Sequence, residues 1–276
     1  MASMPDELLM QRAGWRPTLL VAASIALHGV ALLLLLWRPA WWQQLLALVV
    51  LNHVVLTTCG LLPRSRWLGP NLTRLPAAAT ARREIAITID DGPDPAVTPT
   101  VLDILDRFQA RATFFCIGSK AEQHTELCRE IVRRGHAVEN HSQRHRHTFA
   151  FMGPAGFRRE LQQAQDTITG ITGQRPSFFR APAGLRNPLL DPVLHELRLQ
   201  LASWTRRGYD TRTSDPEVLL QRLAHGLQAG DILLLHDGNS ALTAAGTPAI
   251  LQVLPRLLAS ATSAGLRCVT LKAACG

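Results

Sequence analysis

Two long apolar runs open the chain, residues 17–37 (PTLLVAASIALHGVALLLLLW) and residues 41–62 (WWQQLLALVVLNHVVLTTCGLL), and neither contains a charged side chain. Each run is long enough to cross a bilayer as a helix of about 20 residues. Only the three residues RPA separate the two runs, so the pattern predicts a helical hairpin. We therefore expect a transmembrane hairpin over 17–62, preceded by a short segment over 1–16.

Two other interpretations of the hairpin remain open. A cleaved signal peptide has an apolar stretch of roughly 7–15 residues and a small-residue cleavage site, and the first run is longer and lacks such a site. A buried hairpin of a soluble protein is the second alternative, and it rests on the polar residues of the second run, Gln43, Gln44, Asn52 and His53. Tryptophans favour the membrane interface, and three of them gather at the turn: Trp37, Trp41 and Trp42.

After the hairpin the pattern changes twice. Residues 63–83 mix proline, small residues and arginine without a sustained period, which is typical of a linker. From residue 84 to 276 short apolar runs alternate with longer amphipathic runs. The predicted strands are 84–89, 111–116, 136–140, 177–180, 199–204, 231–235 and 267–271. The predicted helices are 97–108, 119–134, 154–169, 187–195, 215–228 and 247–263.

This alternation predicts an α/β domain with parallel strands, either a barrel or an open doubly wound sheet. In both arrangements functional groups collect at the carboxyl ends of the strands. Polar clusters follow the predicted strands at just these points: DDGPD, NHSQRHRH, RAPAG, YDTR and HDG. We therefore expect the clusters to meet on one rim and form a single site.

The chain has a formal net charge of +8, and several of its arginines flank the hairpin. Arg12 and Arg16 precede the first run, five arginines follow the second run within residues 64–83, and the turn carries only Arg38. Because arginine and lysine are retained in the cytoplasm, both ends of the hairpin and the C-terminal domain are predicted on the cytoplasmic side of the inner membrane. If the second run lies only in the interface, the domain is outside the cytoplasm. No basic motif interleaved with aromatic residues indicates nucleic acid.

The DDGPD cluster places two carboxylates, Asp90 and Asp91, side by side at the end of a strand. Adjacent residues of a strand point to opposite faces unless the chain turns, and Gly92 and Pro93 supply a turn. Both carboxylates could then reach the rim and do different work. The alternative is an ordinary acidic turn that caps the following helix.

The HSQRHRH cluster contains His141 and His145, four residues apart, a spacing that places two side chains on one face of a helical turn. Two neutral imidazoles and one carboxylate are a common ligand set for catalytic zinc. A divalent cation would offset the repulsion between the aspartates, with one as ligand and the other free to act as a base. His236 could serve as general acid, since its unperturbed pKa lies near neutrality. The alternative is a solvated basic loop.

The stretches TIDDGPDP, HSQRH, RAPAG and LLLH, together with Asp210, stand in the order and rough spacing of the polysaccharide deacetylase family, and the resemblance covers residues 84–272. This family is also called the NodB-homology family or carbohydrate esterase family four. The resemblance implies a distorted (β/α)7-type barrel and a divalent metal, usually zinc, with cobalt or manganese as alternatives.

The resemblance also implies a role for each matching residue. Asp90 would be the catalytic base, and the metal ligands would be Asp91, His141 and His145. Arg180 would orient the base, Asp210 would pair with the catalytic His236, and Leu234 would line the acyl groove. The backbone around Pro182, Ala183 and Gly184 would contact substrate and stabilise an oxyanion. Two positions depart from the family: Ala183 stands where an aromatic residue is common, and Thr211 where a tryptophan is usual. Tyr209 or Trp204 could fill the space.

The sequence thus predicts a membrane-anchored, metal-dependent deacetylase that removes an N-acetyl or other N-acyl group from an amino sugar of a glycan or lipid-linked saccharide. Its partners would be that saccharide and membrane lipid. Two other functions stay open. One is a carbohydrate-binding or scaffold module with a decayed pocket, which Ala183 and Thr211 would explain. The other is a magnesium-dependent transferase that uses the DDGPD stretch as its metal motif.

Overall fold

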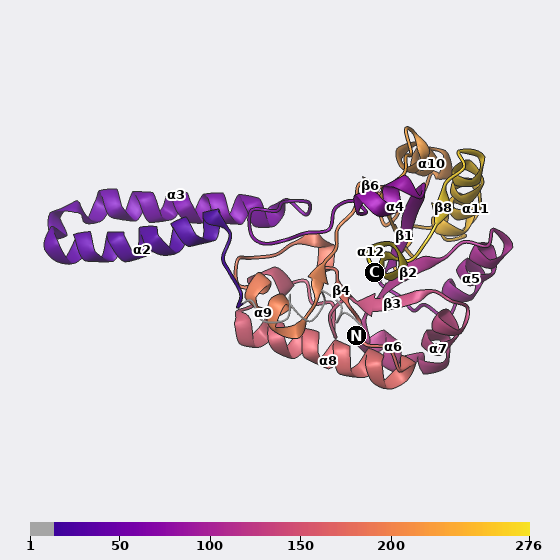
Figure 1. Cartoon of the computed structure of the whole chain (residues 1–276), viewed down its shortest axis with the longest axis horizontal. Helices are drawn as coiled ribbons and strands as arrows, with labels where there is room; N and C mark the ends of the chain where they lie inside the picture. The colour runs from indigo at the N-terminus through magenta and orange to yellow at the C-terminus, as the bar shows by residue number, and fades with distance from the viewer. Residues whose placement is uncertain (1–13) are drawn as a thin grey trace, which may run out of the picture.

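The computed structural model describes residues 14–276, so most of the predicted 1–16 segment lies outside the described residues. A long helical hairpin projects from one side of an α/β domain (Figure 1). The hairpin consists of α2 (Leu19–Trp37), a 3-10 turn (Pro39–Trp41) and α3 (Trp42–Leu61). Its tip points away from the domain, and both of its other ends return to the domain.

The two hairpin helices turn their apolar side chains outward. Only 11% of the apolar window in the first helix and 17% of that in the second are buried inside the molecule. A core helix of a soluble protein would be mostly buried, so this alternative does not fit. Polar residues pair across the hairpin: Asn52 Nδ2 donates to Ser24 Oγ at 2.8 Å, and His28 Nε2 lies 3.3 Å from His53 Nε2. Asn52 and His53 of the second run therefore have partners within the hairpin.

The domain is built on a parallel sheet that curls into a half-barrel. Its strands run in the order β5-β4-β3-β2-β1-β7-β6, and β8 pairs with the beginning of β1. The strands are β1 (Glu84–Asp90), β2 (Ala112–Cys116), β3 (Ala137–Asn140), β4 (Phe178–Phe179), β5 (Gln200–Leu201), β6 (Arg206–Arg207), β7 (Ile232–His236) and β8 (Arg267–Cys268). No ladder joins β5 to β6 in the described residues, so the barrel is open there. The predicted distorted barrel is confirmed.

Helices cover the outer face of the sheet (Figure 1). They are α5 (Thr98–Arg107), α6 (Gly118–Gln123), α7 (Thr125–Arg133), α8 (Pro154–Thr172), α9 (Leu190–Leu197), α10 (Pro216–Ala224) and α11 (Ala249–Ser263). Because side chains alternate along a strand, Ile85, Ile87 and Ile89 of β1 pack outward against these helices. Ala86, Thr88 and Asp90 face the inside of the barrel by the same alternation.

The inside of the barrel is filled by a second apolar group, the inner cluster. It includes Phe115 of β2, Leu234 of β7 and Trp204, which lies between β5 and β6. Two short helices contribute to it, α4 (Ala77–Ala81) through Ala79 and α12 (Leu271–Cys275) through Leu271. Most polar groups of the barrel therefore lie at its carboxyl-end rim, and Arg180 extends from there into the inside, where it contacts Thr88.

Several elements differ from the sequence prediction. The predicted strand 199–204 is only β5, and β6 at 206–207 was not predicted because two arginines carry no apolar signal. The predicted helix 119–134 is interrupted at His124 and forms α6 and α7. Neither α4 nor α12 was predicted. Residues 63–83, expected as a linker, contain α4; Leu68 packs against the hairpin and Leu75 packs in the inner cluster of the domain.

Parallel pairing brings the polar clusters to one rim. Asp90, at the end of β1, is in register with His236, at the end of β7. The end of β3, Asn140, is in register with Phe179 of β4, which directly precedes Arg180. The base of the hairpin also meets this side of the domain, because Arg186 N–H donates to the Gly60 carbonyl at 3.2 Å. The predicted convergence on one rim is confirmed.

Candidate active site

A tight turn after β1 separates the two adjacent carboxylates. Asp91 has a φ of +73°, a left-handed conformation that reverses the chain direction. Gly92 allows the turn to pack closely, because a Cβ there would lie 2.4 Å from Asp237 Oδ1. A Cβ at Gly238 would lie 2.1 Å from the Asp91 carbonyl oxygen. Glycine at both positions therefore lets the loops after β1 and β7 touch.

Asp91, His141 and His145, which we call the metal triad, bring three ligand atoms within 4.8 Å of one another. The Nε2 atoms of His141 and His145 each lie 3.2 Å from Asp91 Oδ1. His141 Nδ1–H donates to the Arg180 carbonyl at 2.8 Å, since a carbonyl can only accept. That bond leaves His141 Nε2 with its lone pair directed at the triad.

The triad fits a divalent cation. Asp91 Oδ1 is buried and has no hydrogen-bond partner in the described residues. In the neutral tautomer of His141, a lone pair would face this carboxylate oxygen, and two acceptors facing one another repel unless a proton or a cation lies between them. One carboxylate oxygen and two imidazole nitrogens are a donor set that binds zinc and similar metals, with positions left open for water and substrate.

The electrostatics keep two of the three ligands in their metal-binding state. Burial and the neighbouring His141 lower the pKa of His145 to about 4, so its ring is neutral at pH 7. Burial opposes ionisation of Asp91, but the close contact with His141, together with His145 and His236, outweighs it and holds the pKa of Asp91 below its usual range. Asp91 is therefore ionised.

Asp90 has a different partner, a guanidinium buried inside the barrel. Arg180 Nη1 donates to Asp90 Oδ1 and to Thr88 Oγ1, each at 2.7 Å. Arg180 also donates to the carbonyls of Ala202 and Ser203. Asp90 Oδ2 lies on the triad side, 3.9 Å from His141 Nε2. One oxygen of Asp90 is thus fixed by Arg180 while the other faces the metal triad.

His236 is held by a second buried carboxylate. Its Nδ1–H donates to Asp210 Oδ1 at 2.8 Å, and its backbone N–H donates to Asp210 Oδ2 at 2.7 Å. Burial alone would lower the pKa of His236, but the hydrogen bond and charge of Asp210, with Asp90 and Asp91 nearby, raise it above its usual value. A raised pKa lets His236 keep its proton to higher pH than a free imidazole does, so the ring can donate a proton.

Comparisons with known proteins identify the family to which this chain belongs. The family model described as polysaccharide deacetylase matches residues 77–202. A chitooligosaccharide deacetylase of Azorhizobium caulinodans is 36% identical over 157 residues, which are 56% of this chain and 73% of the relative. A peptidoglycan-N-acetylglucosamine deacetylase of Bacillus cereus is 32% identical over 180 residues, which are 63% of this chain and 81% of the relative. The chain belongs to the polysaccharide deacetylase family.

Solved structures of the polysaccharide deacetylase family share the fold. A family 4 carbohydrate esterase pseudoenzyme from Bacillus anthracis superimposes with a TM-score of 0.66 at 22% identity, covering 76% of this chain and 70% of that chain. A likeness at this identity concerns the fold alone. The predicted family and its barrel are confirmed, and members of the family are metalloenzymes, which agrees with a triad able to hold a cation.

The structure brings the predicted chemical groups together, while their individual roles stay predictions. Five of them form one network on the rim: Asp90, Asp91, His141, His145 and Arg180. Asp210 and His236 form a separate pair, and His236 is in register with Asp90 on the neighbouring strand. Pro182, Ala183 and Gly184 form a 3-10 turn that begins two residues after Arg180, with Ala183 at a φ of +54°. Leu234 lies in the inner cluster, and Tyr209 is 50% exposed beside the rim.

Sequence reasoning missed several supporting groups. Asn239 Nδ2 donates to Asp91 Oδ2 at 2.9 Å and so orients this ligand. Asp237 lies behind the turn, where Thr98 Oγ1 donates to it at 2.5 Å and burial raises its pKa to about 7. Thr88 accepts from Arg180 inside the barrel. The HDG cluster indicated the loop after β7, but the sequence does not distinguish Asn239, whose amide orients Asp91, from the other residues of that loop.

Loss of a triad ligand should weaken metal binding selectively. We expect His141→Ala and Asp91→Ala each to lower the affinity for Zn²⁺ by more than about 100-fold, because changes behind the ligands already cost about 10- to 100-fold. Titration of the purified protein with zinc against a competing chelator measures this. Asp166→Asn, which removes a carboxylate exposed on α8, is the matched control. Equal zinc affinity in wild type and both triad variants would contradict the site.

Asp210→Asn should move the alkaline limb of the pH–rate profile to lower pH. His236 is proposed to act in its protonated form, and Asp210 raises its pKa, so wild type keeps the proton as pH rises. Removing the carboxylate charge lowers that pKa, and activity should then be lost at lower pH. The measurement is kcat against pH at saturating zinc. An unchanged limb, with Asp166→Asn as control, would rule out this role of the pair.

Proposed function

We propose that the protein is a membrane-anchored, metal-dependent hydrolase that removes an N-acyl group, in the first place acetyl, from an amino sugar of a glycan or lipid-linked saccharide. The observation that carries the proposal is that adjacent Asp90 and Asp91 contact different partners, Arg180 and the two histidines of the triad. The relatives named as deacetylases of peptidoglycan N-acetylglucosamine and of chitooligosaccharide support this substrate class.

The proposed roles follow from what each side chain contacts. Asp91, His141 and His145 would hold a divalent cation, in our proposal Zn²⁺ with Co²⁺ or Mn²⁺ as alternatives, which would act as a Lewis acid on the acyl oxygen and lower the pKa of water. Asp90 takes a proton through Oδ2, since Arg180 holds its other oxygen. His236 donates a proton to the leaving nitrogen, because Asp210 keeps its Nδ1 protonated and its Nε2 available.

The proposed substrate contacts lie around this centre. The turn Pro182–Gly184 would offer a backbone amide to the developing oxyanion, because it begins two residues after Arg180 on the rim. Leu234 would form the apolar floor for the acyl methyl group from within the inner cluster. Tyr209 adjoins Asp210 and would contact the sugar. Ala183 and Thr211 widen the site where the family commonly has aromatic residues.

The hairpin is proposed as a two-pass anchor. Residues 17–62 would span the inner membrane, residues 63–83 would connect them to the domain, and residues 84–276 would form the catalytic domain. Thr18 Oγ1 donates to the Trp67 carbonyl at 2.6 Å, and Trp15 Nε1 donates to Asp191 Oδ2 at 2.7 Å, so the base of the hairpin is joined to the domain. The arginine distribution favours a cytoplasmic domain.

Neither alternative function is favoured by the site. A decayed binding module would be expected to have lost a ligand, base or acid, whereas this chain retains every side chain proposed for these roles. A magnesium-dependent transferase would use oxygen ligands, whereas two of the three triad ligands are imidazole nitrogens.

Acetate release tests the proposed reaction. Full-length protein in detergent, loaded with zinc, should release acetate from N-acetylated amino sugars. Asp90→Asn should lower kcat by about 10²- to 10⁴-fold, the usual contribution of a general base, while zinc affinity stays near that of wild type. Asp166→Asn controls for the loss of a carboxylate. No release from any N-acyl donor by zinc-loaded wild type would instead favour a binding module.

Topology reporters test the proposed orientation. A green fluorescent protein fused after Gly276 should fluoresce, because this reporter folds in the cytoplasm, and an alkaline phosphatase fused there should be inactive. The same two reporters fused at Arg38, at the hairpin tip, should give the opposite pattern. Active phosphatase after Gly276 would place the domain outside the cytoplasm and favour peptidoglycan or an exported glycan as substrate.

A further inference from the structure

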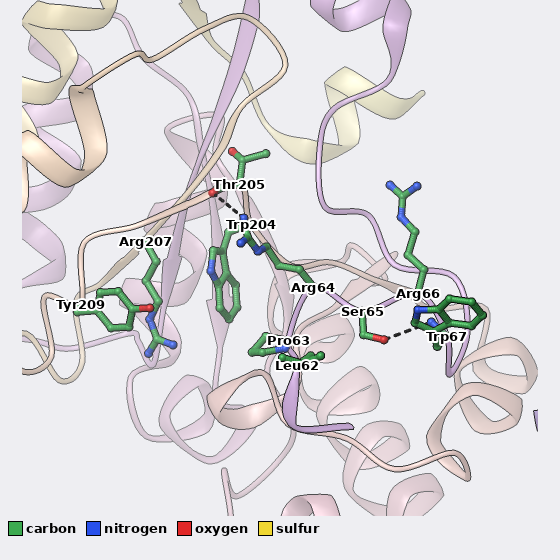
Figure 2. A pocket seen from close by; sticks show the side chains of 10 residues that line it. All are labelled: Leu62, Pro63, Arg64, Ser65, Arg66, Trp67, Trp204, Thr205, Arg207 and Tyr209. Carbon is green, nitrogen blue, oxygen red and sulfur yellow. Dashed lines mark hydrogen bonds between the residues drawn. The ribbon is translucent and has the colours of Figure 1, made fainter. Parts of the chain in front are cut away.

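A groove runs over the domain from the end of α3 toward the rim. It consists of two adjoining hollows of about 700 and 590 Å³. The two hollows share four lining residues, Arg64, Thr205, Arg207 and Tyr209. Figure 2 shows the first hollow, with Arg64 reaching the Thr205 carbonyl and the Trp204 ring standing in its wall. We call these hollows together the arginine groove.

The groove is strongly basic. Six arginines line it: Arg64, Arg66, Arg74, Arg206, Arg207 and Arg222. Its one lining carboxylate, Asp231, is already paired with Arg74 at 3.2 Å and with Arg206 at 2.6 Å. The remaining charges are therefore not neutralised by the groove itself. Such a surface attracts a negatively charged ligand.

Arg207 is the groove residue best placed to bind an anion. Its guanidinium lies 5.2 Å from the Trp204 ring centroid and 4.9 Å from that of Tyr209. Its Nε is buried without a hydrogen-bond partner, and among the described residues no carboxylate forms a salt bridge with it. Aromatic contacts thus hold the planar group in place, while its two Nη groups make no hydrogen bond among the described residues. A preorganised guanidinium suits the bidentate recognition of phosphate.

The groove lies between the hairpin and the catalytic groups. Leu62 and Pro63, the first residues after α3, form one end of it, and Leu62 and Trp67 there are 55% and 63% exposed. The segment 204–210 forms the other side. At the beginning of this segment Trp204 lies 5.8 Å from the Arg180 guanidinium, and at its end Asp210 binds His236. An anion in the groove is therefore flanked by the membrane anchor and by the site.

We propose that the substrate is an N-acylated amino sugar joined by a phosphate ester to a membrane lipid, and that Arg207 and Arg64 bind this phosphate. The proposal rests on the proposed deacetylase function and names its substrate class. The lipid chain would stay in the bilayer beside α3, the phosphate would lie in the arginine groove, and the sugar would reach the metal triad. A neutral glycan would leave the groove without its counter-charge.

Paired substrates test the proposal with full-length, zinc-loaded protein in nanodiscs of phosphatidylcholine. One is an N-acetylglucosamine linked through phosphate to a prenyl chain, and the other is the same sugar linked to the same chain as a neutral glycoside. Wild type should have a kcat/KM at least about 10-fold higher for the phosphate-linked compound. Arg207→Met should lower this ratio by about 10- to 100-fold, mainly through KM, because a charged hydrogen-bonded contact is lost.

Three further variants show whether the effect belongs to the groove. Arg64→Met should lower the ratio in the same direction. Arg207→Lys, which keeps the charge but not the planar fork, should restore part of it. Arg175→Met removes an exposed arginine after α8, away from the groove, and should leave the ratio unchanged. An equal ratio in wild type, Arg207→Met and Arg175→Met would overturn the proposal.

The same proteins separate failure of this proposal from failure of the proposed function. Hydrolysis of both substrates without any dependence on phosphate or Arg207 would support the deacetylase and overturn the groove. Binding of the phosphate-linked compound that is lost in Arg207→Met, without acetate release, would support the groove and contradict the deacetylase. If the Arg207→Met effect appears only in nanodiscs that contain phosphatidylglycerol, the groove binds a phospholipid headgroup and the proposal is wrong.

Discussion

The site depends on the different partners of two neighbouring carboxylates. Side by side, Asp90 and Asp91 would repel each other, and the fold relieves this repulsion by turning them toward different positive groups. Asp90 accepts from the buried guanidinium of Arg180, and Asp91 faces two imidazoles that can share a cation with it. Arg180 is 1% exposed, so its charge requires Asp90 as much as Asp90 requires Arg180. The turn at Gly92 thus separates the proposed base, Asp90, from the proposed metal ligand, Asp91.

The hairpin and the site are parts of one arrangement. The turn after Arg180 packs against the residues that leave α3, because a Cβ at Gly184 would lie 2.7 Å from Pro63 and 2.8 Å from Trp204. Arg186, a little further along, donates to the Ser65 carbonyl at 2.5 Å. The end of the hairpin is therefore fixed relative to the rim. A substrate held in the bilayer would then reach the proposed catalytic groups at a fixed distance from the membrane surface. This distance would limit the orientations that its sugar can adopt in the site.

The sequence was informative where function and fold share a strong local signal. Strand ends followed by DDGPD, HSQRH and LLLH located the rim and brought Asp91, His141 and His145 together, because parallel strands leave no other place for their carboxyl ends. It failed where structure depends on distant contacts. Strand β6 is formed by two arginines that only pairing with β7 makes extended, and α4 is short and gains its stability from the inner cluster. The groove joins Arg64 to Thr205 across 141 positions, so no local pattern could indicate it.

The central claim is that one cation is bound jointly by Asp91, His141 and His145 while Asp90 remains with Arg180. Crystals grown with zinc, measured on both sides of the zinc absorption edge, test this most directly. The account predicts one strong anomalous peak on the rim, about 2.0–2.2 Å from a carboxylate oxygen of Asp91 and from the Nε2 atoms of both histidines. A peak bound by Asp90 in place of Asp91, or zinc bound only at other residues, would contradict it.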